Sequence, residues 1–275
     1  MHAEYDDLFI YLPSMLVEGK SLGTAKAADL SLGQDILKAK DIDPAAFAKE
    51  RKKGTTVGKR KLEQVQTRVR TKLLELIGEW DSGELYDTEL RKGAAKLMKT
   101  AWRDVFLAGL RAGGTKGTGA GKGKTLVALS PGDDVWLKSA MQHETRFLNK
   151  FMTAIVDETY KMPLPRRVEM YVNALSGFYQ SARVISLPES TLIRWTGPHD
   201  KKTCASCRWL FDNNPYTKYT LPVTPKSGAT ICLTNCRDRL TIRRVGLNEA
   251  RARTKGQIRE SLARKLQRIK KTGKA

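Results

Sequence analysis

Apolar residues recur at three- and four-residue spacing in the first half of the chain, which is typical of helices with one buried face. The first stripe consists of Leu62, Val65, Val69, Leu73 and Leu76. After a break at Asp81 and Gly83, the second consists of Leu90, Ala94, Leu97, Ala101, Val105 and Leu110. We therefore predict two core-facing helices. Upstream we expect short helices around 30–40 and 44–53, the second opened by Asp43 and Pro44 as N-cap and first helical residue.

The second half changes from helical to strand-like patterning. Helices are predicted at about 133–160 and 166–184, separated by Pro163 and Pro165. Short β-like runs at 192–196 and 240–245 flank a loop rich in Pro, Gly, Asn and Cys, and a basic amphipathic helix closes the chain. The expected fold is α-rich α+β, with helical N-terminal and middle regions, a small β-hairpin module and a basic C-terminal helix. No apolar run is long enough to cross a bilayer, so no membrane segment is expected.

Seven glycines lie between residues 109 and 123, with lysines among them. Such a segment gains too little from burial to offset its ordering entropy, so we predict a flexible linker and a domain boundary. The expected organisation is a helical, basic N-terminal region (1–108), a Gly/Lys-rich linker (109–126), a helical region (127–190), a four-cysteine module (191–245) and a basic tail (246–275). A P-loop is not expected, because Thr118 stands where its first glycine is needed.

Positive charge is concentrated in two segments. The 275 residues carry a net charge of +21, and residues 49–72 and 246–275 each supply +8 of it. Local blocks of this kind bind phosphate by counterion release, and nucleic acid is the usual polyanion. A solvated helix face or a frayed tail is the alternative for either segment alone. The residues assigned to non-specific nucleic-acid contact are Arg51, Lys52, Lys53, Lys59, Arg60, Lys61, Arg251, Arg253, Lys255, Arg259, Arg264, Lys265, Arg268, Lys270 and Lys271.

The four cysteines form two close pairs, Cys204 with Cys207 and Cys232 with Cys236. A gap of two residues lets a tight turn aim both thiolates at one tetrahedral ion, and a gap of three is workable. A metal would also have to hold a loop with so little apolar content. We predict a zinc-stapled module whose closed four-thiolate site is structural and not catalytic. Two disulfides or free thiols are the alternatives, and synthesis in a reducing cytoplasm argues against disulfides.

The residues around the cysteines carry a wider pattern. It runs from Trp195 through Asp200-Lys-Lys-Thr203-Cys204-Ala-Ser-Cys207 to Asn235-Cys236-Arg237 and an apolar strand. In order and spacing, roughly residues 165–245 resemble the C-terminal module of tailed-phage minor head, or head morphogenesis, proteins (the Mu F-like family). That family usually has His at the position of Leu233 and often a further Cys at that of Asp238. We take Cys232 as the fourth ligand, with His199 in reserve.

The resemblance implies a structural virion protein at the portal vertex, made in the host cytoplasm, that acts in head assembly and in DNA packaging or delivery. It implies the portal and other head proteins as partners. It brings no established enzymatic activity, so we expect no enzyme. The two basic segments fit a protein that faces packaged DNA. Within the module, Trp195 is expected to pack beneath the hairpin and Trp209 to contact a partner, since interface hot spots favour Trp.

Two other classes of protein compete with this interpretation. A zinc-containing nucleic-acid-binding regulator would need a recognition helix docked on the zinc module, and we predict no helix between the two cysteine pairs. A metal-dependent nuclease would need His, Asp or Glu ligands and an open metal position, whereas this loop supplies chiefly thiols.

Overall fold

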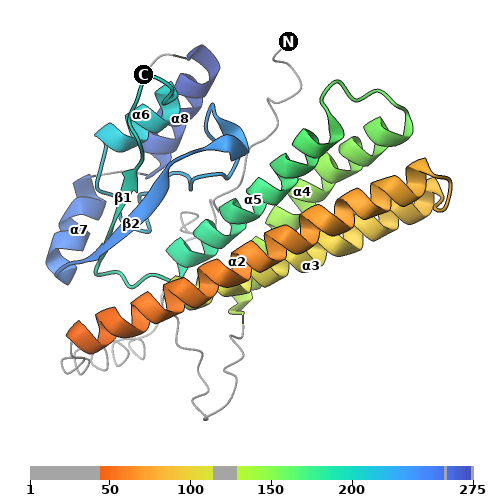
Figure 1. The fold of residues 1–275 in the computed structure, drawn as a ribbon. Helices are drawn as coiled ribbons and strands as arrows, with labels where there is room; N and C mark the ends of the chain where they lie inside the picture. Colours follow the sequence, from red (N-terminus) through yellow and green to blue (C-terminus); the bar gives the residue numbers. More distant parts are fainter. Residues whose placement is uncertain (1–43, 114–128, 257–258, 274–275) are drawn as a thin grey trace, which may run out of the picture.

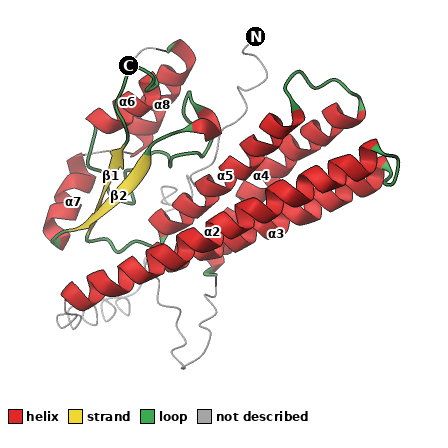
Figure 2. Cartoon of the chain, in the orientation of Figure 1, coloured by secondary structure: helices red, strands yellow, loops and turns green. Residues whose placement is uncertain are grey.

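The computed structural model describes residues 44–113, 129–256 and 259–273. It is helix-rich, with one small antiparallel sheet (Figures 1 and 2). The helices are α2 (Pro44–Asp81), α3 (Asp87–Gly113), α4 (Pro131–Val156), α5 (Leu164–Ile185), α6 (Ala205–Asp212), the 3₁₀ turn η4 (Leu233–Asn235), α7 (Leu247–Gly256) and α8 (Arg259–Thr272), and the strands are β1 (Thr191–Thr196) and β2 (Arg239–Arg244). The predicted α-rich α+β class is confirmed.

Helices α2 to α5 form a bundle around one hydrophobic core (Figure 1). Both predicted stripes face this core, with Leu76 and Leu97 only partly buried at its margin. Aromatic rings join the helices, since Trp102 stacks on Phe178 at 5.8 Å between ring centroids. Helix α2 is one continuous helix, so the stretch predicted as a short helix at 44–53 is its beginning. Residues 30–40 lie outside the described part of the chain.

The glycine-rich stretch begins inside a helix. Gly109 and Gly113 belong to α3, not to a linker as predicted. A Cβ on Gly109 would lie 2.3 Å from the Tyr179 carbonyl oxygen of α5, so glycine here permits close approach of two helices. Core residues come from helices on both sides of the stretch, which therefore joins parts of a single core. Residues 114–126 of the predicted linker lie outside the described ranges.

A second, smaller core lies beside the C-terminal half of α5 and consists of Val184, Leu187 and residues of the module 191–273. Strands β1 and β2 pair antiparallel, with Trp195 opposite Leu240. This confirms both predicted strands, but no hairpin turn joins them, because all of residues 197–238 intervene. Helices α6 and α8 pack against each other, and α8 contributes Leu266 and Ile269 to the core.

Backbone contacts dock the module on the bundle. A Cβ at Gly177 of α5 would lie 2.9 Å from the Lys226 carbonyl oxygen, and the buried hydroxyls of Ser181 and Thr224 hydrogen-bond at 3.0 Å. The loop between the strands is therefore fixed by α5 as well as by its own contacts. Among the described residues, none of the helices has the length and apolarity needed to cross a membrane.

Candidate metal centre

Two short helical turns position the four cysteines. Cys204 is the N-cap of α6, and Cys207 lies in its first turn. Cys232 and Cys236 flank the 3₁₀ turn η4, directly before β2. Cys207 and Cys236 are buried, and Cys204 and Cys232 are half-buried. The two sequence pairs thus become two facing turns at the edge of the module core.

The sulfur atoms lie close enough to share one ion. The Cys207 Sγ is 3.4 Å from the Cys232 Sγ and 3.6 Å from the Cys236 Sγ. The Sγ atoms of Cys204, Cys207 and Cys232 lie within 4.8 Å of one another. Zinc–sulfur bonds of about 2.3 Å would set tetrahedral sulfurs about 3.8 Å apart, whereas a disulfide needs about 2.05 Å. All four are free thiols, and the cluster could hold a metal ion.

The thiols share protons unequally. Hydrogen bonds from Cys207 and Cys232, together with the backbone N–H of Asp238, hold the pKa of Cys236 well below its usual range. The hydrogen bonds of Cys204, Cys232 and Cys236 raise the pKa of Cys207 in turn. Metal binding would require the remaining thiols to release their protons, because the thiolate is the form that binds a metal ion.

An exposed ion pair joins the two segments that carry the cysteines. The Arg237 guanidinium donates two hydrogen bonds to Asp200, at 2.6 and 2.8 Å. Asp200 also accepts from the backbone N–H of Lys202 and from the Thr203 hydroxyl. Arg237 and these donors hold the pKa of Asp200 well below its usual range. The loop before Cys204 is thereby joined to the residue after Cys236.

A second contact joins the two halves from the buried side. The indole N–H of Trp195 donates to the Asp238 carboxylate at 2.6 Å, and Trp195 is fully buried, as predicted. An Asp238 carboxylate oxygen lies within 4.8 Å of the Cys207 and Cys236 sulfurs. Asp238 was noted in the sequence only because the resembling family often has cysteine at that position. Its place two residues after Cys236 was the signal that could have predicted a carboxylate beside the thiols.

The reserve ligand His199 is not part of the cluster. Its exposed imidazole stacks on Phe211, with ring centroids 4.2 Å apart, and its φ is 49°. Among the described residues, the groups that could ligate an ion contain cysteines and Asp238 but no histidine. The choice of Cys232 as fourth ligand agrees with this geometry.

Two predictions about this region are wrong. Trp209, predicted as a partner contact, is only 4% exposed and belongs to the module core, where the Lys265 ammonium lies 5.9 Å from its ring centroid. A helix also occurs where none was predicted, since α6 continues past Cys207 to Asp212. Both follow from one cause: α6 turns Trp209 and Leu210 inward against α8.

The predicted nucleic-acid contacts fall into three groups. The exposed ones are Lys59, Arg60, Arg251, Arg264, Lys265, Arg268 and Lys271, and the half-buried ones are Lys61, Arg253 and Lys270. The side chains of Arg51, Lys52, Lys53, Lys255 and Arg259 lie outside the described part. Arg253 does not fit its predicted role, because its guanidinium donates to the carbonyl oxygens of Asn213, Asn214 and Pro215 at 2.7–3.1 Å.

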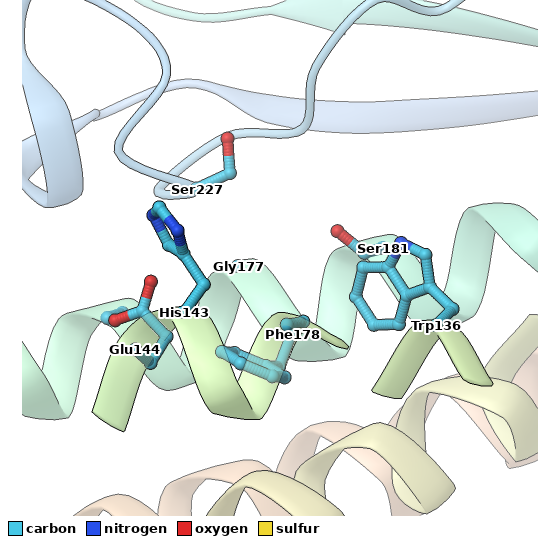
Figure 3. A pocket seen from close by; sticks show the side chains of 9 residues that line it. Trp136, His143, Glu144, Gly177, Phe178, Ser181 and Ser227 are labelled. Carbon is cyan, nitrogen blue, oxygen red and sulfur yellow. The ribbon is translucent and has the colours of Figure 1, made fainter. Parts of the chain in front are cut away.

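A small cavity lies between the bundle and the module (Figure 3). His143 and Glu144 rise from α4 toward the loop that carries Ser227, and Gly177 and Ser181 of α5 are also among the lining residues. Its volume of about 10 Å³ leaves no room for an organic substrate. The cavity is a feature of the docking interface.

Comparison with known proteins leaves the chain without an assigned family: no family profile, no curated protein and no solved structure matches it.

Proposed function

We propose that the chain is a structural protein of a tailed-phage head, located at the portal vertex, whose C-terminal module is held by one zinc ion. One observation carries the proposal. The residues that resemble the head-protein motif are the ones that join the two cysteine segments. Asp200 of the first half accepts hydrogen bonds from Thr203 and from Arg237 of the second half, and the buried Trp195 donates one to Asp238 of the second half. The motif thus describes one interlocked unit and not a chance series of residues.

Zinc is the ion that the donor set favours. Four thiolates on two turns make a closed tetrahedral site with no position left for a reacting water, which is typical of structural zinc. Elemental analysis of the purified chain should give about one zinc per chain. Cys236→Ser should lose most of it, while Lys202→Gln, a change at an exposed neighbour, should retain it. A metal-free wild-type chain, or a Cys236→Ser variant that keeps full zinc, would contradict the assignment.

The head assignment is tested with native particles of the source phage. The chain should co-purify with heads and bind isolated portal in a pull-down. Arg237→Gln should weaken both through loss of the Asp200 pair, while exposed Lys92→Gln on α3 should not. If the chain is absent from purified heads and does not bind portal, the proposed location at the portal vertex is wrong.

Contact with packaged DNA is the second part of this function. The support is the net +8 of residues 49–72 and of 246–275. Full-length chain should bind two unrelated 30-base-pair duplexes equally, with affinity falling steeply as salt rises. Deleting residues 246–275 would remove Leu266 and Ile269 from the module core, so charge substitutions are the better probe.

A zinc-containing, sequence-specific nucleic-acid-binding regulator is the second candidate, because α6 lies directly on the thiol cluster. Its buried Trp209 and Leu210 leave Arg208 and Phe211 on the accessible side. Selection from a random duplex pool separates the two functions. A recovered sequence bound at least about 10³-fold more tightly than the pool would favour the regulator.

A further inference from the structure

The β1–β2 ribbon has two chemically different faces. Paired residues of an antiparallel ribbon share a face, and alternate rows point to opposite sides. The rows Trp195–Leu240 and Ile193–Ile242 point into the module core. The rows Thr196–Arg239, Arg194–Thr241 and Leu192–Arg243 therefore form the other face, on which Leu192 is buried and the arginines are exposed.

Three arginines dominate this outer face. Arg194, Arg239 and Arg243 are all exposed, as is Thr241. They alternate between the strands along three successive rows, so their Cα atoms form a zigzag. The two strands carry four arginines and no acidic residue. Only the pairing brings these charges together, because Arg194 is separated from the others by the whole inter-strand loop.

Little on the protein neutralises these charges. Arg243 pairs with Glu249 at 2.9 Å, but both side chains stay more than half exposed, so the pair is open to exchange. Within the described residues, the guanidinium groups of Arg194 and Arg239 have no carboxylate partner. Lys201 and Lys202, in the turn that follows β1, are exposed and add positive charge to the module.

We propose that this outer face, the arginine ribbon of Arg194, Arg239 and Arg243, binds the phosphate backbone of duplex DNA. Rows two residues apart lie about 6.8 Å from each other, which is close to the rise along the helix axis between phosphates two nucleotides apart on one DNA strand, at about 3.4 Å for each nucleotide. Arginine suits this task because its planar fork binds phosphate oxygens in pairs.

The inference rests on the proposed DNA contact of the chain and gives it a surface outside the two basic segments. We expect the ligand to be duplex DNA and not an acidic protein segment, because the rows of the arginine ribbon repeat at a regular spacing, as the phosphates of a duplex do. Strand β2, which carries Arg239 and Arg243, begins three residues after Cys236, so a metal-held turn there would fix where this strand starts.

The test compares three triple substitutions in the full-length chain. Arg194→Gln/Arg239→Gln/Arg243→Gln removes the ribbon charges. Lys92→Gln/Lys96→Gln/Lys99→Gln removes the same net charge from exposed positions on α3. A third variant, with Arg264, Arg268 and Lys271 each changed to Gln, probes α8. Binding to a mixed-sequence 30-base-pair duplex is followed by fluorescence anisotropy across a salt series, with zinc content and helical signal as folding checks.

The ribbon variant should lower the slope of log K against log salt by about 2–3, at about 0.9 for each lost phosphate contact. The α3 variant should leave the slope unchanged, and Arg194→Gln alone should lower it by about 0.9. Equal slopes for the ribbon and α3 variants would overturn the ribbon while leaving DNA binding intact. A wild-type chain that binds no duplex at low salt would overturn the proposed DNA contact and the ribbon together. Ribbon-dependent binding to polyglutamate but not to DNA would overturn the choice of partner.

Discussion

Glu144 should make the stability of the fold depend on pH. Its side chain is 5% exposed between α4, α5 and the loop at Ser227, and among the described residues its Oε1 has no hydrogen-bond partner (Figure 3). Desolvation raises the pKa of Glu144 from 4.5 to about 7. Each unit of difference corresponds to about 1.4 kcal/mol, so ionisation costs the folded state about 3 kcal/mol.

The sign follows from which state holds the proton more tightly. The folded chain keeps Glu144 protonated between pH 4.5 and about 7, where the unfolded chain has already released that proton. Stability from this group is therefore complete below pH 4.5 and is lost as pH rises toward 7. Glu144→Gln stays neutral throughout. The variant should exceed the wild-type free energy of unfolding by less than about 1 kcal/mol at pH 5 and by about 3 kcal/mol at pH 8.

Urea unfolding followed by circular dichroism at pH 5, 6, 7 and 8 measures this difference. Subtracting the wild-type free energy of unfolding from that of Glu144→Gln cancels the titration of all other carboxylates. Exposed Glu84→Gln serves as the control, and its difference from the wild type should not change between pH 5 and 8. A difference between Glu144→Gln and the wild type that stays flat from pH 5 to 8 would refute the reasoning. It would mean that Glu144 reaches solvent or a cation in the folded chain.

Three further predictions test the packing and the site. Gly109→Ala should destabilise the bundle by about 1–3 kcal/mol in urea unfolding because its Cβ meets the Tyr179 carbonyl, whereas Gly78→Ala, with open space around it, should not destabilise it. Removing metal with a strong chelator should abolish the near-ultraviolet signal of Trp195 and Trp209 but keep most of the far-ultraviolet helical signal, since the bundle has its own core; loss of both signals together would contradict two separate cores. Trp209→Ala should lower the free energy of unfolding of the module by about 3–5 kcal/mol and reduce its zinc content; a variant with unchanged stability would contradict the burial of Trp209 in the module core.

Local periodicity was sufficient for most of the fold. The stripe from Leu62 to Leu73 is buried as predicted, because a helix sets side-chain direction by spacing alone. The same holds for β1 and β2, whose short apolar runs pair in the small sheet. The cysteine site was predictable for a similar reason, since each pair fits one turn and only the meeting of the two turns required the fold.

Amino-acid composition did not predict local structure or burial correctly where contacts with a distant segment determine them. Seven glycines in fifteen residues indicate a linker, yet Gly109 lies in helix α3, where the Tyr179 backbone of α5 occupies the space that a side chain would fill. The inter-strand loop looked too polar to form a core. Its threonines are nevertheless buried. The hydroxyls of Thr217 and Thr220 hydrogen-bond to each other at 3.2 Å, so these two hydroxyls are satisfied without water.

The distribution of charge shows the same limit in another form. Net charge summed over consecutive residues identifies basic segments such as 49–72 and 246–275, because the sum includes only neighbours in the chain. It counts Arg253 as available, although that guanidinium binds backbone carbonyls inside the module. It also separates Arg194 from Arg239, which register places on neighbouring rows of one face. The field that a polyanion meets is a sum over that face, so the strand register, and not the local count of basic residues, decides where this module presents positive charge.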